Sequence, residues 1–272
     1  MASGEGAGAR LERRVYHFLA HPLAWLHWIW VRELRTQEIY FRDHPRFLFW
    51  RPMYRVARRP MARVVGRPLS ELDAYFDELA PLHAELRREV SDLPIAGALS
   101  QAPLLYVIVR AMKPRWLVET GISSGYSTRL LLEALERNGE GHLDSIGIDV
   151  FALRRGDAAP AAPLAGRRVG WLVPERFADR WRLHLGRSDE VLPGLLDGKG
   201  PTLDLFLHDS LHQYATMRWE YETAWPSLRP SGLLASHDIH ASSAWPEFLQ
   251  RHRVSADADL DRDLGIARAG PA

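Results

Sequence analysis

The amino-acid sequence predicts an open, doubly wound α/β fold with a mainly parallel sheet. From Arg115 onward, short apolar segments alternate with helical patterns, as is typical of parallel sheets covered by helices on both faces. A glycine-bearing turn joins the first apolar segment to a leucine-rich helix, in the stretch ETGISSGYSTRLLLEAL that begins at Glu119. Polar residues stand at the ends of later apolar segments. Small molecules bind at this carboxyl edge of such sheets.

From Arg115 onward the predicted strands and helices alternate along the chain. The expected strands are 116–119, 142–149, 181–185, 203–208 and 233–236, with a further edge strand at 264–269. The expected helices are 70–90, 96–112, 126–138, 189–196, 214–225 and 243–253, and 150–173 is expected to be a loop with a short helix. In the helix 214–225, aromatic residues and Met217 recur at helical spacing, which indicates core packing.

The glycine turn after the first strand is expected to bind a ligand. Gly121 and Gly125 have no Cβ, so the backbone can bend sharply and another group can approach it closely. Hydroxyls and a helix N-cap are expected from Ser123, Ser124 and Ser127. A dinucleotide fingerprint needs a second and third glycine, where this chain has Ser123 and Tyr126. A pyrophosphate cofactor is therefore disfavoured, and the absence of Gly-Lys-Ser or Gly-Lys-Thr after the turn excludes a P-loop.

A carboxylate is expected at the end of the second strand. The segment Ser145-Ile-Gly-Ile-Asp149 ends in an acid, one helix and one strand after Gly121. In nucleoside-binding α/β folds, an acid in this place accepts hydrogen bonds from the ribose hydroxyls. Asp149 therefore indicates a nucleoside-like ligand at the same edge of the sheet as the glycine turn.

The turn resembles motif I of the class I S-adenosylmethionine-dependent methyltransferases, which reads acidic-x-G-x-x-x-G, here from Glu119 to Gly125. The resemblance covers roughly 70–269. It implies a seven-stranded sheet whose last hairpin strand is antiparallel, with S-adenosylmethionine as cofactor. An adenine contact is implied after the third strand, where Ser188 is equally suited to cap the next helix. The expected cofactor-binding residues are Glu119, Gly121, Ser123, Ser124, Gly125, Ser127, Asp149, Ser188, Asp189 and Asp209.

Histidines and aspartates cluster after the fourth and fifth predicted strands. The first group is His208, Asp209 and His212, and the second begins with His237-Asp238. This resembles the small-molecule and sugar O-methyltransferase branch, in which such carboxylates in some members bind a divalent cation that holds the acceptor hydroxyls. The match departs from catechol-type members, which read Asp-Asn after the fifth strand.

Three roles remain open for this group. A histidine could remove the acceptor proton near neutral pH, with His208, Asp209, His212 and His237 as the catalytic residues. Alternatively, Mg²⁺ or another divalent cation could acidify the hydroxyl, held by Asp209, His237 and Asp238. In the third reading the side chains only cap helices and orient one another.

The N-terminal quarter differs from the rest in charge. The whole chain has a net charge of +1, but residues 1–68 carry 13 Arg against five acids, a net charge of 13 − 5 = +8. We therefore divide the chain into a basic, Trp-rich extension, 1–69, and a methyltransferase domain, 70–272. The extension is predicted to be a helical cap over the core or over a partner in a homo-oligomer. A membrane-surface arm is the second reading, and a nucleic-acid arm is the least favoured.

Composition limits the chemistry and the location. The chain has no cysteine, which excludes disulfides, thiolate metal sites and a cysteine nucleophile and fits a reducing cytoplasm. The uncharged stretch 15–31 contains three histidines and a proline and is short for a membrane span, and no signal peptide is expected. The sequence thus predicts a cytoplasmic enzyme, or one peripheral at the membrane, that methylates an oxygen of a small molecule such as a sugar or natural product. The alternatives are an RNA or lipid methyltransferase and a non-catalytic cofactor- or nucleoside-binding module.

Overall fold

The computed structural model describes residues 45–89, 101–149, 167–260 and 263–270, all within one compact unit, Pro45–Ala272. Predictions made for residues 1–44, 96–100 and 150–166 lie outside these ranges. Among the described helices, none is both long and apolar enough to span a membrane.

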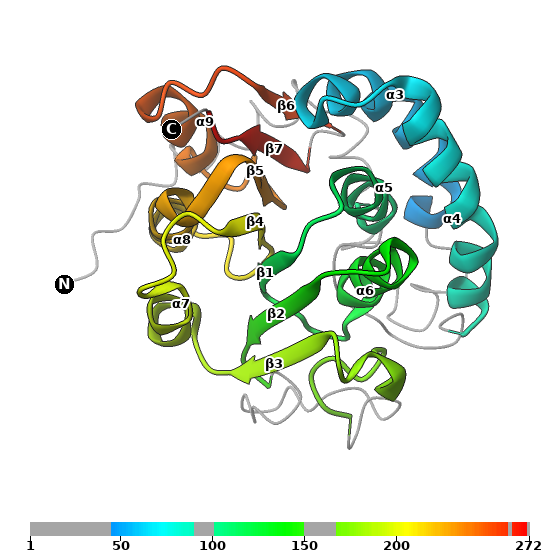
Figure 1. The fold of residues 1–272 in the computed structure, drawn as a ribbon, viewed down its shortest axis with the longest axis horizontal. Helices are drawn as coiled ribbons and strands as arrows, with labels where there is room; N and C mark the ends of the chain where they lie inside the picture. The colour runs from blue at the N-terminus through cyan, green and yellow to red at the C-terminus, as the bar shows by residue number, and fades with distance from the viewer. Residues whose placement is uncertain (1–44, 90–100, 150–166, 261–262, 271–272) are drawn as a thin grey trace, which may run out of the picture. The chain divides into compact units, whose positions relative to one another are not determined.

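The described residues form a seven-stranded sheet with the strand order β3-β2-β1-β4-β5-β7-β6 (Figure 1). The strands are β1 Trp116–Thr120, β2 His142–Gly147, β3 Trp181–Leu185, β4 Leu203–His208, β5 Leu228–Ser236, β6 Asp257–Asp259 and β7 Gly265–Arg268. The first five pair in parallel, and β7 runs antiparallel to both β5 and β6. The predicted doubly wound sheet with one antiparallel strand is confirmed.

Helices cover both faces of the sheet. They are α3 Pro45–Val65, α4 Leu69–Glu89, α5 Ala102–Met112, α6 Tyr126–Asn138, α7 Ser188–Leu196, α8 Tyr214–Ala224 and α9 Ala244–Arg251, with short 3₁₀ turns at Glu175–Phe177 and Trp225–Ser227. Figure 1 shows α7, α8 and α9 on one side and α5 and α6 on the other, with α3 and α4 outside α5. Because both faces are covered, the inner strands β1 and β4 are buried along their whole length.

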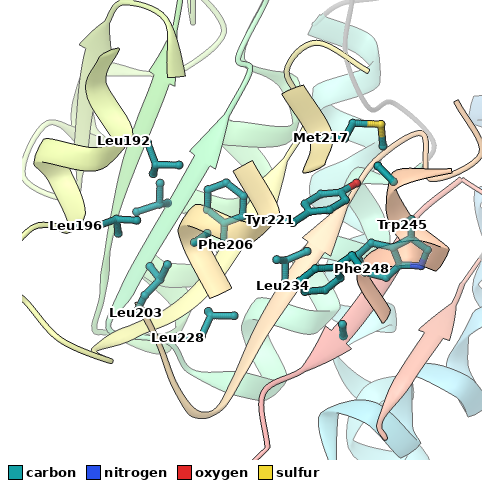
Figure 2. Packing of buried hydrophobic residues seen from close by; sticks show 14 of the residues in the cluster. Leu192, Leu196, Leu203, Phe206, Met217, Tyr221, Leu228, Leu234, Trp245 and Phe248 are labelled. Carbon is teal, nitrogen blue, oxygen red and sulfur yellow. The ribbon is translucent and has the colours of Figure 1, made fainter. Parts of the chain in front are cut away.

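One large apolar cluster fills the space between the sheet and α7, α8 and α9 (Figure 2). Phe206 and Leu234 from the sheet meet Tyr221 of α8 and Phe248 of α9 there, all at most 2% exposed. Each such side chain contributes about 1.5–3 kcal/mol through burial. The predicted core stripe on α8 is confirmed for Met217 and Tyr221, which are fully buried.

Helix α3, from the predicted extension, packs against α5, β6 and β7. Its Tyr54 ring stacks on Phe76 of α4 with centroids 3.8 Å apart, and the Tyr54 hydroxyl donates to Asp73 at 2.9 Å. The Arg67 guanidinium, just after α3, donates to the carbonyl oxygen of Ala111 at 3.2 Å. Within the basic region, α3 and Arg67 are therefore in contact with the sheet-forming part of the chain.

Candidate active site at the carboxyl edge of the sheet

Gly121 and Gly125 both adopt the left-handed conformation, each with φ = 85°. A Cβ at Gly121 would lie only 2.0 Å from the carbonyl oxygen of Asp209. The Asp209 N–H in turn donates to the carbonyl oxygen of Thr120 at 2.8 Å. The close approach expected at Gly121 thus involves the loop after β4, and the missing side chain lets two loops of the site cross in contact.

The rest of the turn is covered by the segment that precedes β3. The N–H groups of Gly170 and Leu172 donate to the carbonyl oxygens of Ser123 and Ser124, at 2.8 and 3.0 Å. The predicted serine N-cap is wrong, because Gly125 is the N-cap residue of α6 and no side chain caps the helix. The first N–H groups of α6 have no acceptor inside the helix, so this end of the helix is suited to an anionic ligand group.

Glu119 is fully buried in β1. It accepts a 2.5 Å hydrogen bond from the Ser145 hydroxyl of β2, and that hydroxyl accepts one from the Trp181 indole of β3 at 2.8 Å. Burial raises the pKa of Glu119 to about 7. The acid of motif I therefore connects three strands beneath the turn, and burial favours its protonated form relative to an exposed glutamate.

The remaining predicted cofactor residues lie at the ends of β2 and β3. Asp149 stands two residues beyond β2 and is partly exposed. Ser188 is the first residue of α7, whose N-cap is Arg187, so the alternative of a Ser188 cap is wrong. Asp189 is exposed and pairs with Arg187 at 2.6 Å. Since β2 lies between β1 and β3, these residues share the edge that carries the glycine turn, and their contact with a cofactor stays a prediction.

Asp209, His212 and His237 come together at the ends of β4 and β5. The Asp209 Oδ1 atom lies 2.8 Å from Nδ1 of His237 and 3.6 Å from Nε2 of His212. One potential ligand atom from each residue lies within 4.8 Å of the others. Asp238, predicted as a metal ligand, instead pairs with Nδ1 of His212 at 3.1 Å. Asp238 also lies 3.7 Å from Nε2 of His237, so its carboxylate is close to both imidazoles, and the metal-ligand roles of these residues stay predictions.

The charged forms of Asp209 and His237 stabilise each other. Burial alone would raise the pKa of Asp209, but the charge of His237 lowers it to about 2. Burial alone would lower the pKa of His237, but the Asp209 carboxylate raises it to about 9. The Asp209 carboxylate therefore favours the protonated form of His237, which makes His237 a poor proton acceptor while this pair is intact.

His208 contacts the cluster, since its ring lies edge-on to that of His212 with centroids 5.4 Å apart, and it pairs with Glu220, which the sequence analysis missed. The His208 ring is fully buried, and its Nδ1 lies 2.6 Å from Oε2 of Glu220. Thr120 and Ser210 also donate to this carboxylate, at 2.5 and 2.7 Å. Burial opposes ionisation of Glu220, but its bond with His208 lowers the pKa below the usual value. A signal was present, because an acid stands on the buried face of α8 between Met217 and Ala224.

Residues 118–239 match a family model described as a methyltransferase domain. No curated protein matches the chain. Solved structures that are similar include the O-methyltransferase TomG from Streptomyces achromogenes, described as involved in tomaymycin synthesis and in complex with SAM. It is 20% identical, with 70% of this chain and 88% of that chain covered and a TM-score of 0.42.

Two further solved structures have comparable sequence identity and coverage. An O-methyltransferase from Bacillus cereus in complex with SAH is 16% identical, with 72% of this chain and 90% of that chain covered and a TM-score of 0.46. An SAH-bound methyltransferase from Podospora anserina is 15% identical, with coverages of 74% and 94% and a TM-score of 0.47. The family match shows a methyltransferase domain over residues 118–239, and the sheet order with the antiparallel β7 is the one that the resemblance to class I methyltransferases predicted.

Proposed function

We propose that the protein transfers a methyl group from S-adenosylmethionine to an oxygen of a small molecule, such as a sugar or natural-product hydroxyl. The observation that carries this proposal is the cluster of Asp209, His212 and His237 beside the glycine turn, on a methyltransferase domain. Imidazole and carboxylate groups suit the removal of a proton from a hydroxyl. A non-catalytic binding module would have no need of them.

The residues at the sheet edge fit the cofactor at two points. The uncapped start of α6 suits a carboxylate, and Asp149 at the end of β2 suits a pair of ribose hydroxyls. S-adenosylmethionine carries both groups, and when bound it supplies a methyl group made electrophilic by the positive sulfur. The task of the chain is then to hold the acceptor oxygen in line with that carbon, and positioning of this kind contributes several kcal/mol.

The acceptor is expected beside Asp209 and His212. His212 is partly exposed and can take the acceptor proton, while Asp238 and Asp209 on either side of it stabilise the imidazolium that forms. Leu211, next to it, is 54% exposed and offers an apolar contact to the acceptor. A divalent cation bound by the same cluster would lower the pKa of the hydroxyl instead.

The basic N-terminal extension is proposed to cover the domain. Helix α3 supports this reading, since it packs on α5, β6 and β7. Membrane-surface contact, a homo-oligomer and a cytoplasmic location remain proposals, the last based on the absence of cysteine.

Binding of the cofactor tests the proposal at its first step. Titration calorimetry with S-adenosylmethionine should give at least micromolar affinity, on the order of −8 kcal/mol. The Asp149→Ala substitution should weaken binding by about tenfold or more, since charge-assisted hydrogen bonds to the ribose are lost. As a control, Glu140→Ala removes an exposed acid that pairs with Arg115 before the start of β2, at the opposite end of that strand, and it separates the ribose role of Asp149 from a general loss of negative charge. Tighter binding of NAD, or no binding of S-adenosylmethionine, would overturn the assignment.

A further inference from the structure

We infer that the outer side of helix α3 binds the anionic headgroups of a phospholipid bilayer. Four exposed arginines and one exposed valine form this surface, which we call the arginine row: Arg55, Val56, Arg59, Arg63 and Arg67. The inference goes beyond the proposed methyl transfer and does not depend on it.

The arginines of the row recur at every fourth position. Three of them lie in α3, and Arg67 follows two residues after its end. Side chains four residues apart in an α-helix lie next to each other on one face, and the helical part of the row is about 12 Å long at about 1.5 Å per residue. All four side chains are exposed, so α3 presents a strip of positive charge to solvent.

The opposite face of α3 is already used by the core. Its buried residues recur at helical spacing and are at most 3% exposed: Tyr54, Ala57, Met61 and Val64. The helix is therefore amphipathic, but its apolar face is packed on the domain and is not free to insert into a bilayer. The basic face remains for a partner, so the attraction to that partner is mainly electrostatic.

Within the described part of the chain, no carboxylate pairs with an arginine of the row. Helix α3 contains six arginines and no acid. Among the side chains that the structure describes there, Arg58 is the arginine that pairs with a carboxylate, that of Asp73 in α4 at 2.6 Å. Arg63 and Arg67 donate to backbone carbonyl oxygens at 3.3 and 3.2 Å, which leaves their charges uncompensated. Like charges four residues apart destabilise a helix, and an anionic surface would remove that repulsion.

Apolar residues favour a bilayer over a nucleic acid as the partner. Val56, next to Arg55, is 71% exposed, the largest exposed fraction among the large hydrophobic residues that the structure describes. An aliphatic side chain can enter the boundary between headgroups and acyl chains, whereas nucleic-acid sites use aromatic rings that stack on bases. The sequence also contains an uncharged stretch with three tryptophans at 15–31, and tryptophan is enriched at membrane–water interfaces. Cations beside an aliphatic side chain therefore fit lipid headgroups better than a nucleic-acid backbone.

Sedimentation with lipid vesicles tests the inference on the full-length protein without S-adenosylmethionine. We expect the protein to sediment with vesicles of phosphatidylcholine that contain about 30% phosphatidylglycerol, and not with vesicles of phosphatidylcholine alone. Raising the salt from about 0.1 M to about 0.5 M should weaken binding at least about tenfold, because exposed charges are screened. No binding, equal binding to both kinds of vesicle, or binding that salt does not change would overturn the inference. Because no cofactor or acceptor is present, the result is independent of whether the proposed methyl transfer holds.

Substitutions then locate the surface. Arg55→Gln combined with Arg59→Gln should weaken binding to the anionic vesicles about twentyfold, because each arginine near such a surface contributes about fivefold. The matched control combines Arg182→Gln with Arg251→Gln, which removes the same charge from exposed positions in β3 and α9. It should change binding by less than about twofold, since charges beyond a screening length from the bilayer contribute little. Circular dichroism checks that each variant is folded.

Three outcomes with the variants would contradict a lipid-binding role for the arginine row. A loss below about threefold in the Arg55→Gln, Arg59→Gln variant would show that lipid binds elsewhere on the protein. An equal loss in the control variant would show an effect of net charge rather than of this surface. If the Arg55→Gln, Arg59→Gln variant loses binding to single-stranded RNA and keeps its binding to vesicles, the row is a nucleic-acid site.

Discussion

Asp209→Asn should lower kcat/KM for methyl transfer by at least about a hundredfold, the lower range for losing a group that assists proton transfer. The carboxylate stabilises the charged form of His237 and lies 3.6 Å from His212, so its loss disturbs both imidazoles of the cluster. Affinity for S-adenosylmethionine should change by less than about tenfold, since an interaction made at the acceptor affects turnover more than cofactor binding. Steady-state kinetics and calorimetry on the same preparation measure the two effects.

A matched control is Asp259→Asn on the edge strand β6. That carboxylate is exposed and pairs with His240, and an exposed ion pair contributes little, so turnover should be unchanged. If Asp209→Asn keeps turnover within a few-fold of the parent, the cluster is structural and the acceptor binds elsewhere. If both activity and cofactor affinity fall together, Asp209 acts mainly at the cofactor.

Gly121→Ala should destabilise the fold by about 2–5 kcal/mol, the sum of left-handed backbone strain and overpacking. The added Cβ would lie 2.0 Å from the Asp209 carbonyl oxygen and 2.8 Å from the Ser210 Cα, and backbone cannot move aside as a side-chain tip can. Urea unfolding measures the loss as a lower midpoint at an unchanged slope.

The Gly139→Ala variant separates backbone strain from overpacking. Gly139 has φ = 78°, and a Cβ there would meet nothing within 4 Å, so only the strain of about 1–2 kcal/mol should appear. Equal losses in the two variants would mean that the loop after β4 relaxes without cost, and that Gly121 is needed for its conformation alone.

Alternation of apolar segments and helical patterns was enough to predict most of the sheet. The sequence predicted β3, β4 and α6 with the bounds that the structure has, because each is an uninterrupted apolar or amphipathic run. The first part of β5 was missed since Arg229-Pro-Ser-Gly232 carries turn-forming residues. The three-residue strand β6 alternates Asp, Ala and Asp and has too little pattern to stand out.

The sequence predicted which residues gather at the site, but it did not predict which of them contact one another. Parallel strands bring the residues after β4 and β5 to one edge, so the meeting of Asp209 with His237 followed from topology. Which neighbouring side chain points inward depends on the path of each loop, and sequence spacing does not fix that path. This is why the pairing of Asp238 with His212 was not predicted, and why the bond between Glu220 and His208 was missed.

The central claim is methyl transfer from S-adenosylmethionine to an oxygen of a small molecule. The most direct test incubates the protein with methyl-labelled S-adenosylmethionine and a cell extract, then separates small molecules, lipids and RNA. The account predicts label in the small-molecule fraction, present as an O-methyl group by nuclear magnetic resonance, together with S-adenosylhomocysteine in equal amount. Label in lipid or RNA, label on nitrogen or carbon, or no transfer above a heat-inactivated control would contradict it.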